Sequence, residues 1–318
     1  MPLRLDHLII WDFWLAPRLT QGDPFHIFFL QAPRSIPDPG HRHNLATVGH
    51  AISHDLSNWS YVGTALGPAP PGSWDDFTIW TGCVVHHDHR WYMFYTGRSR
   101  AENGQVQRIG IAMSDDLSTW SRVGEGAVLE ADPRWYQRRN DNLGLRQDCR
   151  DPWVLRRDNE WLMYFTSTHA LAKPDGRGVI GLATSEDLMT WEHQGPITRP
   201  GQFSEIEVPQ VVQLGGQWLM LFCTAQHSLE RQRKGLKWNG SHYFTSDSPY
   251  GSFSLAPGEP LLAGEHGTLY AARIVDDPWI EPCLLAWRRW NESGNFAGDI
   301  TDPIPLTISP NGRLAVVS

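Results

Sequence analysis

The segment Ile-Ser-His-Asp-Leu-Ser-Asn-Trp at residues 52–59 recurs as Met-Ser-Asp-Asp-Leu-Ser-Thr-Trp at 113–120 and as Thr-Ser-Glu-Asp-Leu-Met-Thr-Trp at 184–191. A weaker fourth copy, Thr-Ser-Asp-Ser-Pro-Tyr-Gly-Ser-Phe, occupies 245–253. The aromatic residues that end these copies are roughly 60–70 residues apart, a period typical of one supersecondary unit used repeatedly. A chain of 318 residues has room for about five such units. The repeat therefore predicts an all-β, five-bladed β-propeller.

Strand signals within each unit support this prediction. Short apolar runs and aromatic-rich runs flank a polar turn, for example in 83–95 and 153–165, which is a hairpin pattern. A third run precedes each copied segment and a fourth follows it, so we expect four antiparallel strands per blade. The expected blade limits are 8–65, 75–130, 145–200, 203–258 and 266–310. No further unit follows, so a single catalytic domain over 1–318 without a C-terminal β-sandwich is expected.

Composition excludes several classes of function. The formal net charge is −8, which provides no basic surplus for binding nucleic acid. We see no apolar run of about 18 residues and no signal-peptide pattern, so we expect no membrane partner and a cytoplasmic location. The four cysteines stand alone without metal-ligand spacing, and no glycine-rich phosphate loop occurs. We therefore expect neither a metal nor a cofactor.

Three carboxylates lie where the innermost strand of a blade begins. Asp12, Asp151 and Glu207 belong to the first, third and fourth blades. Because blades converge on one axis, these distant residues are expected to become neighbours in a central pocket. Clustered carboxylates repel one another, so the pKa of one of them should rise. A protonated carboxylic acid beside an ionised carboxylate is the catalytic pair of a glycosidase. Glu205 competes with Glu207 for the acid role, and Asp23, which reads as a turn residue, competes with Asp12.

Several motifs resemble those of the five-bladed propeller glycosidases that include invertase-like fructosidases, levansucrases and, more distantly, arabinosidases and xylosidases. The similar segments, in order, are 11–14 (Trp-Asp-Phe-Trp), 25–31 (Phe-His-Ile-Phe-Phe-Leu-Gln), 79–83 (Ile-Trp-Thr-Gly-Cys), 150–152 (Arg-Asp-Pro), 207–209 (Glu-Val-Pro) and 269–272 (Leu-Tyr-Ala-Ala). They extend over all five expected blades. The Asn-Asp-Pro-Asn-Gly segment of the invertases is absent.

The resemblance implies a retaining glycoside hydrolase or transglycosylase that acts on β-fructofuranosides. Asp12 would be the nucleophile, Glu207 the acid and base, and Asp151 the residue that binds furanose hydroxyls and stabilises the transition state. The residues expected to bind substrate are Trp11, Gln31, Trp80, Arg150 and Tyr270.

Two other functions stay open at this point. One is an inverting arabinofuranosidase or xylosidase on the same fold, and the other is a propeller that binds sugars without catalysis. A small carbohydrate is the expected partner in each case, and self-association into a homo-oligomer is possible. The histidine-rich segment 86–89 is expected to be a solvated turn, and the basic segment 231–237 an exposed loop bordering the pocket.

Overall fold

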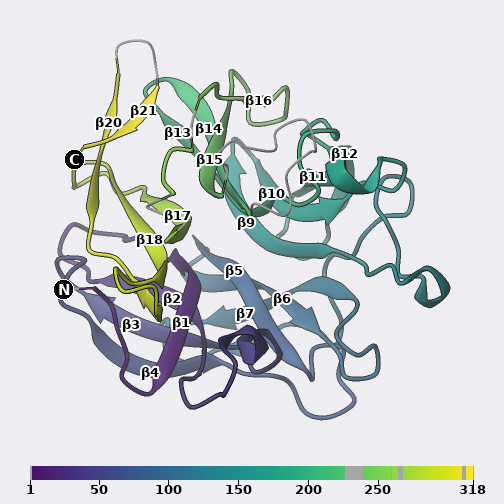
Figure 1. Ribbon diagram of the computed structural model, residues 1–318, viewed down its shortest axis with the longest axis horizontal. Coiled ribbons are helices and arrows are strands. Elements are labelled where there is room, and N and C mark those ends of the chain that lie inside the picture. The colour runs from purple at the N-terminus through teal and green to yellow at the C-terminus, as the bar shows by residue number, and fades with distance from the viewer. Residues whose placement is uncertain (1, 226–238, 259, 264–267, 310–312, 318) are drawn as a thin grey trace.

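A computed structural model describes all residues except 1, 226–238, 259, 264–267, 310–312 and 318. Five antiparallel sheets surround a common centre, as a propeller requires (Figure 1). The predicted five-bladed β-propeller is therefore confirmed. The first and last blades lie next to each other, and Leu3 pairs with Ile300 of the last blade to join the two ends of the ring.

The first four blades each contain four strands in chain order. The first blade consists of β1 (Leu8–Leu15), β2 (Phe25–Pro33), β3 (Thr47–Ser53) and β4 (Ser60–Leu66). The second consists of β5 (Thr78–His87), β6 (Arg90–Arg98), β7 (Gln107–Ser114) and β8 (Ser121–Arg122). The third consists of β9 (Cys149–Arg157), β10 (Glu160–Thr168), β11 (Gly178–Ser185) and β12 (Glu192–Pro196). The fourth consists of β13 (Glu207–Leu214), β14 (Gln217–Thr224), β15 (Gly240–Ser246) and β16 (Ser254–Leu255).

The fifth blade departs from the four-strand pattern because its third strand is divided. Its strands are β17 (Leu269–Val275), β18 (Cys283–Trp290), β19 (Phe296–Ile300), β20 (Ile304–Ile308) and β21 (Leu314–Val316). Both β19 and β20 pair with β18, at opposite ends of it. Pro303 lies between them and has no N–H to continue the ladder. The described residues also form three short 3-10 helices, η1 (Pro39–Asn44), η2 (Asp141–Leu143) and η3 (Pro174–Gly176).

The copied segment forms the same turn in the first three blades. In the third blade the Asp187 carboxylate accepts hydrogen bonds from the N–H groups of Met189 and Thr190, and the Trp191 indole donates to the Leu188 carbonyl. Leu188 has a φ of 68°, and the equivalent residues Leu56 and Leu117 have φ values of 61° and 64°. The Trp191 ring then packs edge-on against Phe94 of the second blade at 5.5 Å. The repeat is therefore a device that joins neighbouring blades.

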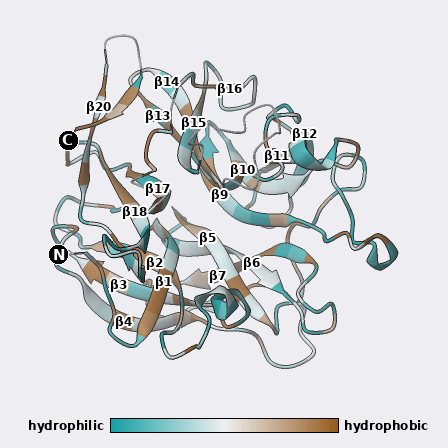
Figure 2. Ribbon diagram, viewed as in Figure 1, coloured by the Kyte–Doolittle hydropathy of each residue, from teal (hydrophilic) through white to brown (hydrophobic). Residues whose placement is uncertain are grey.

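Five hydrophobic clusters lie mainly between adjacent blades and make up the core. Hydrophobic colouring accordingly gathers on strands such as β1 (Figure 2). The second and third blades, for example, share a cluster that contains Phe94, Phe165 and Leu188. The innermost strands β1, β5, β9 and β13 contact one another in succession, and β17 contacts β1. This contact fixes the relative positions of the strand segments that form the central site.

Leu188→Ala is expected to lower the free energy of unfolding by about 2–5 kcal/mol, because the Leu188 side chain is fully buried between two blades. Met189→Ala is the matched control, since Met189 is the next residue of the same turn and is 36% exposed. We expect that change to stay within about 0.5 kcal/mol. Urea unfolding of both variants makes the comparison, and equal losses would contradict this account of the turn.

Candidate active site

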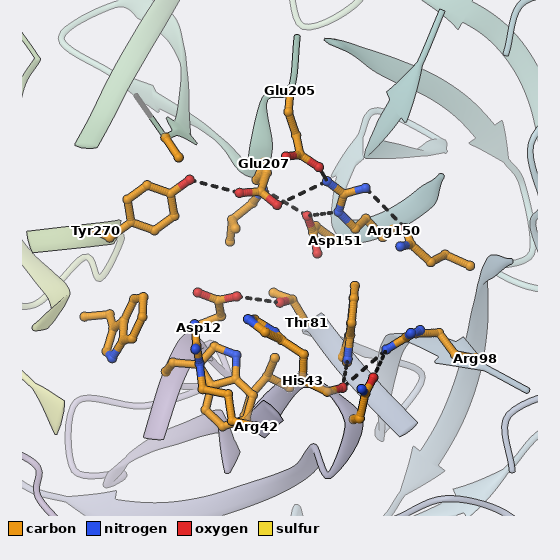
Figure 3. Close-up of a pocket in the computed structure, with 18 of the residues that line it drawn as sticks. Asp12, Arg42, His43, Thr81, Arg98, Arg150, Asp151, Glu205, Glu207 and Tyr270 are labelled. Carbon is orange, nitrogen blue, oxygen red and sulfur yellow. Dashed lines mark hydrogen bonds and ion pairs between the residues drawn. The ribbon is translucent and has the colours of Figure 1, made fainter. Parts of the chain in front are cut away.

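A cavity of about 360 Å³ opens at the centre of the propeller. Residues of all five innermost strands line it, together with η1 and parts of β6 and β18. Figure 3 shows the side chains of Asp12 and Glu207 facing each other across it. The lining residues with ionisable side chains are Asp12, Arg42, His43, Arg98, Arg146, Arg150, Asp151, Glu205, Glu207, Tyr270 and Arg289.

Each innermost strand carries an irregularity at the same place. Pairing with the second strand shifts after Trp11 in β1, after Trp80 in β5, after Arg150 in β9, after Glu207 in β13 and after Tyr270 in β17. A β-bulge leaves one residue unpaired and redirects side chains, which is why bulges are common beside active sites. All five residues just before the shift line the cavity.

The residue after each of these five is the next one along its innermost strand. These next residues form a second layer around the cavity: Asp12, Thr81, Asp151, Val208 and Ala271. Four of these five, all except Thr81, have a positive φ between 26° and 55°. Such a conformation is costly for a residue other than glycine and persists where surrounding structure enforces it. Asp12 and Asp151 thus occupy equivalent positions, whereas Glu207 stands one residue earlier, in the layer of Trp11 and Arg150.

Asp12 is a buried carboxylate with both charged and polar neighbours. The Thr81 hydroxyl donates a hydrogen bond to Asp12 Oδ2 at 3.4 Å. Burial and, to a smaller extent, the nearby Asp151 raise the pKa of Asp12 to about 6, against the opposing effect of Arg42, Arg273 and the Thr81 hydroxyl. At pH 7 the carboxylate is therefore mainly ionised.

Arg273 lies beneath this layer and is 1% exposed. Its guanidinium donates to the Phe13 carbonyl at 3.2 Å and to the Pro209 carbonyl at 2.7 Å. These carbonyls belong to β1 and β13, so Arg273 of β17 connects three innermost strands next to their bulges. Burial raises the pKa of both Asp12 and Asp151, and the charge of Arg273 partly opposes that rise.

Arg150 holds the carboxylates of the opposite wall. Its Nη2 atom lies 2.6 Å from Glu205 Oε1 and 3.1 Å from Glu207 Oε1, and its Nε atom lies 3.4 Å from Asp151 Oδ2. The other Nη atom lies 3.0 Å from Asp148 Oδ1. One guanidinium therefore joins four carboxylates and restricts their orientation.

Glu207 has a pKa raised high enough to keep its carboxyl group protonated at neutral pH, as a general acid requires. Burial and, next in size, the negative charge of Glu205 raise the pKa of Glu207 to about 8, against the opposing effect of Arg150. The Tyr270 hydroxyl donates to Glu207 Oε2 at 2.9 Å. For Glu205, burial favours the protonated form, but Arg150 and Arg146 outweigh it and lower the pKa. At pH 7, therefore, Glu207 is protonated and Glu205 is ionised.

Seven of the eight site residues predicted from sequence line the cavity: Trp11, Asp12, Trp80, Arg150, Asp151, Glu207 and Tyr270. The prediction for Gln31 is wrong. Its amide donates to the hydroxyls of Thr47 and Thr64 and accepts from Tyr61 within the first blade. Side chains alternate along a strand, and it is the preceding residue, Leu30, that lines the cavity.

Three further predictions concern Asp23, the histidine-rich segment 86–89 and the basic segment 231–237. The carboxylate of Asp23 accepts from the N–H groups of Leu19 and Thr20 in an exposed turn, away from the cavity, so the rival nucleophile is excluded. Within the segment 86–89, His86 and His87 end β5, and Asp88 and His89 form the hairpin turn to β6 at positive φ, so the predicted turn is confirmed for its last two residues only. The basic segment 231–237 lies outside the described residues. Among the described residues, no group of three or more His, Cys, Asp or Glu has the geometry to hold a metal ion.

Sequence reasoning missed the cationic part of the cavity. Arg42 and His43 belong to η1, in the connection between β2 and β3, and Arg98 and Arg289 lie at the ends of β6 and β18. The run His-Arg-His-Asn at 41–44 was a usable signal, because it places several polar side chains in one connection between two apolar strand segments.

Comparison with known proteins decides the family. The model of the glycosyl hydrolases family 32 N-terminal domain matches residues 19–299. The chain belongs to this family. The family 32 match contains Asp151 and Glu207 and begins after Asp12, so the position of Asp12 in the cavity is independent evidence about that residue.

Relatives of this family 32 chain have names that refer to fructosides. The sucrose-6-phosphate hydrolase of Bacillus subtilis is 27% identical over 273 residues, which are 83% of this chain and 51% of that protein. A 6(G)-fructosyltransferase of Asparagus officinalis is 33% identical over 129 residues, 37% of this chain and 19% of that protein. The chain thus spans about half the length, or less, of these curated relatives.

Solved structures share the fold. An inulosucrase from Halalkalicoccus jeotgali, bound to kestose, superposes with a TM-score of 0.81 at 21% identity, covering 99% of this chain and 89% of that one. Bacillus subtilis levansucrase gives a TM-score of 0.75 at 14% identity, covering 98% and 87%. The helices among the described residues are 3-10 segments of six residues or fewer, and none qualifies as a membrane span.

Proposed function

We propose that the protein is a retaining glycosidase or transglycosylase that acts on β-fructofuranosides, and that residues 1–318 act as one catalytic domain. The observation that carries the proposal is the pair of carboxyl groups facing each other across the cavity, Asp12 ionised and Glu207 protonated at neutral pH. A glycosidase needs both forms at once. Family membership and the fructoside-related names of the relatives support fructose as the transferred sugar. The cytoplasmic location and the homo-oligomer stay predictions.

In this proposal the Asp12 carboxylate attacks the anomeric carbon of a fructosyl unit, and the bond to the leaving oxygen breaks. Glu207 gives its proton to that oxygen, so the leaving sugar departs as an alcohol. The resulting carboxylate of Glu207 then removes a proton from water or an acceptor sugar, which displaces Asp12. Asp151, held by Arg150, accepts hydrogen bonds from the furanose hydroxyls. Trp11 and Trp80 provide flat apolar walls for the ring.

Product analysis tests this function. We expect purified protein to release fructose, or form new fructosides, from sucrose, inulin or levan, and methanol to trap the fructosyl unit with its β configuration retained. Release of pentose from an arabinofuranoside alone, or an inverted product, would instead indicate the inverting enzyme. Sugar binding without any product would indicate a non-catalytic propeller.

The pH dependence of kcat/KM follows from the two pKa values. Activity needs ionised Asp12 and protonated Glu207, so it should rise through about pH 6 and fall through about pH 8. In Glu205→Gln a negative charge that opposes ionisation of Glu207 is lost, and the pKa of Glu207 should fall. We therefore expect the alkaline limb to move to lower pH while the acid limb changes less. A shift of the alkaline limb to higher pH would contradict this assignment.

A further inference from the structure

Two arginines and two carboxylates next to Glu207 form a closed ring of ion pairs. Asp148 Oδ1 lies 3.0 Å from Arg150 Nη1 and 2.9 Å from Arg146 Nε. Glu205 Oε1 pairs with the Nη2 atoms of both arginines and lies 2.6 Å from that of Arg150. Cations and anions therefore alternate around this ion-pair ring, and its charges balance.

Asp148 is the member of the ion-pair ring that lies outside the cavity. It directly precedes β9, and its side chain is buried. The Thr168 hydroxyl donates to Asp148 Oδ2 at 2.5 Å, and the Ser167 hydroxyl donates to the Asp148 carbonyl at 2.7 Å. Burial favours the protonated form of Asp148, but Arg150, Arg146 and the Thr168 hydroxyl outweigh it and lower the pKa. Asp148 is therefore a fixed, ionised carboxylate at neutral pH.

Glu207 contacts the ion-pair ring from outside. Its Oε1 atom lies 3.1 Å from Arg150 Nη2, the atom that also holds Glu205 (Figure 3). A guanidinium this close to a carboxyl group normally favours the ionised form of that group. Here the two arginines of the ring are already matched by the two carboxylates of the ring. This balance gives a structural reason why Glu207 can stay protonated beside an arginine.

The other ionisable groups near the two carboxylates differ from one another. Those near Glu207 are Asp12 of β1, Arg42 of η1, Asp151 of β9, Cys223 of β14 and Tyr270 of β17. Asp12 and Asp151 raise the pKa of Glu207, whereas burial keeps Cys223 and Tyr270 protonated and uncharged. Near Asp148 lie Arg177 and the buried, protonated thiol of Cys149. The ion-pair ring is what the surroundings of Asp148 and Glu207 have in common.

We propose that Asp148 is a positioning residue, which holds Arg150 and Arg146 in the ion-pair ring and thereby keeps Glu207 protonated from outside the cavity. This inference rests on the proposed role of Glu207 as the acid of a glycosidase. If Asp148 lost its charge, the ring would carry an excess positive charge, and Glu207 would ionise more easily. If Arg146 lost its charge, the excess would be negative, and Glu207 would hold its proton more strongly.

Asp148→Asn is the first test, because the amide has the same size and can still contact Arg150 and Thr168. We expect the pKa of Glu207 to fall by about one pH unit from its value of about 8. NMR titration of protein labelled at the glutamate carboxyl carbons measures this value, and the signal of Glu207 is the one missing from Glu207→Gln. The alkaline limb of kcat/KM should move to lower pH by the same amount.

Arg146→Gln should act in the opposite direction and raise the pKa of Glu207, again by about one pH unit. The side chain of Arg146 is 47% exposed, so this variant also serves if Asp148→Asn fails to fold. In the double variant Asp148→Asn/Arg146→Gln both charges of opposite sign are lost. The pKa should then return to within about 0.3 pH units of the wild-type value, a compensation that general damage to the structure would not produce.

Asp141→Asn is the matched control, because Asp141 pairs with Arg139 at 2.6 Å in an exposed position outside the cavity. That variant should leave the titration of Glu207 unchanged. The inference would be overturned by an unchanged or raised pKa of Glu207 in Asp148→Asn, or by an unchanged or lowered pKa in Arg146→Gln. Loss of activity in Asp148→Asn with an unchanged pKa would mean that Asp148 has a structural role only.

The NMR titration needs no turnover, so its failure is distinct from failure of the proposed function. Opposite pKa changes in the two variants, without cleavage of any fructoside by the wild type, would contradict the proposed reaction alone. Cleavage of fructosides, with no change in the pKa of Glu207 in either variant, would contradict the role of Asp148 alone.

Discussion

Asp12→Asn is expected to lower kcat for sucrose or another fructoside on the order of 10,000-fold, because an amide cannot form the proposed covalent intermediate. Substrate binding should change little, since Asn has the same shape and the Thr81 hydroxyl can still donate to its side-chain oxygen. Single-turnover kinetics with purified variant, together with calorimetric binding of the substrate, measure the two quantities separately.

A second substitution distinguishes a nucleophile from a residue that only positions substrate. In Asp12→Gly, azide can enter the space left by the carboxylate and attack the anomeric carbon itself. We expect azide to restore measurable turnover and to give a fructosyl azide of inverted configuration. A positioning residue would show no such rescue. Asp23→Asn is the matched control, because the Asp23 carboxylate lies in an exposed turn outside the cavity, and that variant should retain full activity.

The sequence was sufficient to predict the ring of blades, because the repeated turn has a local cause. Each copy combines an aspartate that binds the N–H groups of its own turn with a tryptophan that packs on the previous blade. These interactions involve residues close in the chain or repeated at a fixed interval, so a periodic pattern reveals them. The third strand of the last blade is divided into β19 and β20 around Pro303. The other blades have no such division, so the repeat could not predict it.

The candidate site was only partly predictable, for a geometric reason. Carboxylates on innermost strands converge once the propeller is known, and Asp12, Asp151 and Glu207 all line the cavity. Asp12 lies in the middle of β1 and not at its start as predicted, whereas Glu207 is the first residue of β13. The β-bulge, however, decides which of two successive residues faces the cavity. Gln31, which the resemblance suggested, instead bonds within the first blade, and its neighbour Leu30 lines the cavity. Arg42 comes from η1, in a connection between strands, where its guanidinium packs over the rings of Trp11 and Trp287, and such packing between distant residues leaves no local pattern.

Glu207→Gln is expected to lower kcat/KM for sucrose by about 100- to 10,000-fold, the range typical for loss of a general acid. Gln cannot give a proton to the departing oxygen, although it can still accept from the Tyr270 hydroxyl. The loss should depend on the leaving group. Fluoride departs without protonation, so kcat/KM for fructosyl fluoride, which reports formation of the fructosyl-enzyme, should stay within about tenfold of wild type. The alkaline limb near pH 8 should also disappear from the profile.

Glu205→Gln provides the comparison that identifies the acid. Glu205 shares Arg150 with Glu207, but its lowered pKa keeps it ionised at neutral pH, so it has no proton to give. Any loss caused by Glu205→Gln should therefore be equal for sucrose and fructosyl fluoride, because it acts through the environment of Glu207. The opposite pattern would identify Glu205 as the acid. In that case Glu205→Gln would lose much kcat/KM for sucrose and little for fructosyl fluoride, whereas Glu207→Gln would lose equally for both substrates. The two carboxylates are held by one guanidinium, and the difference in their charge state is what separates their roles.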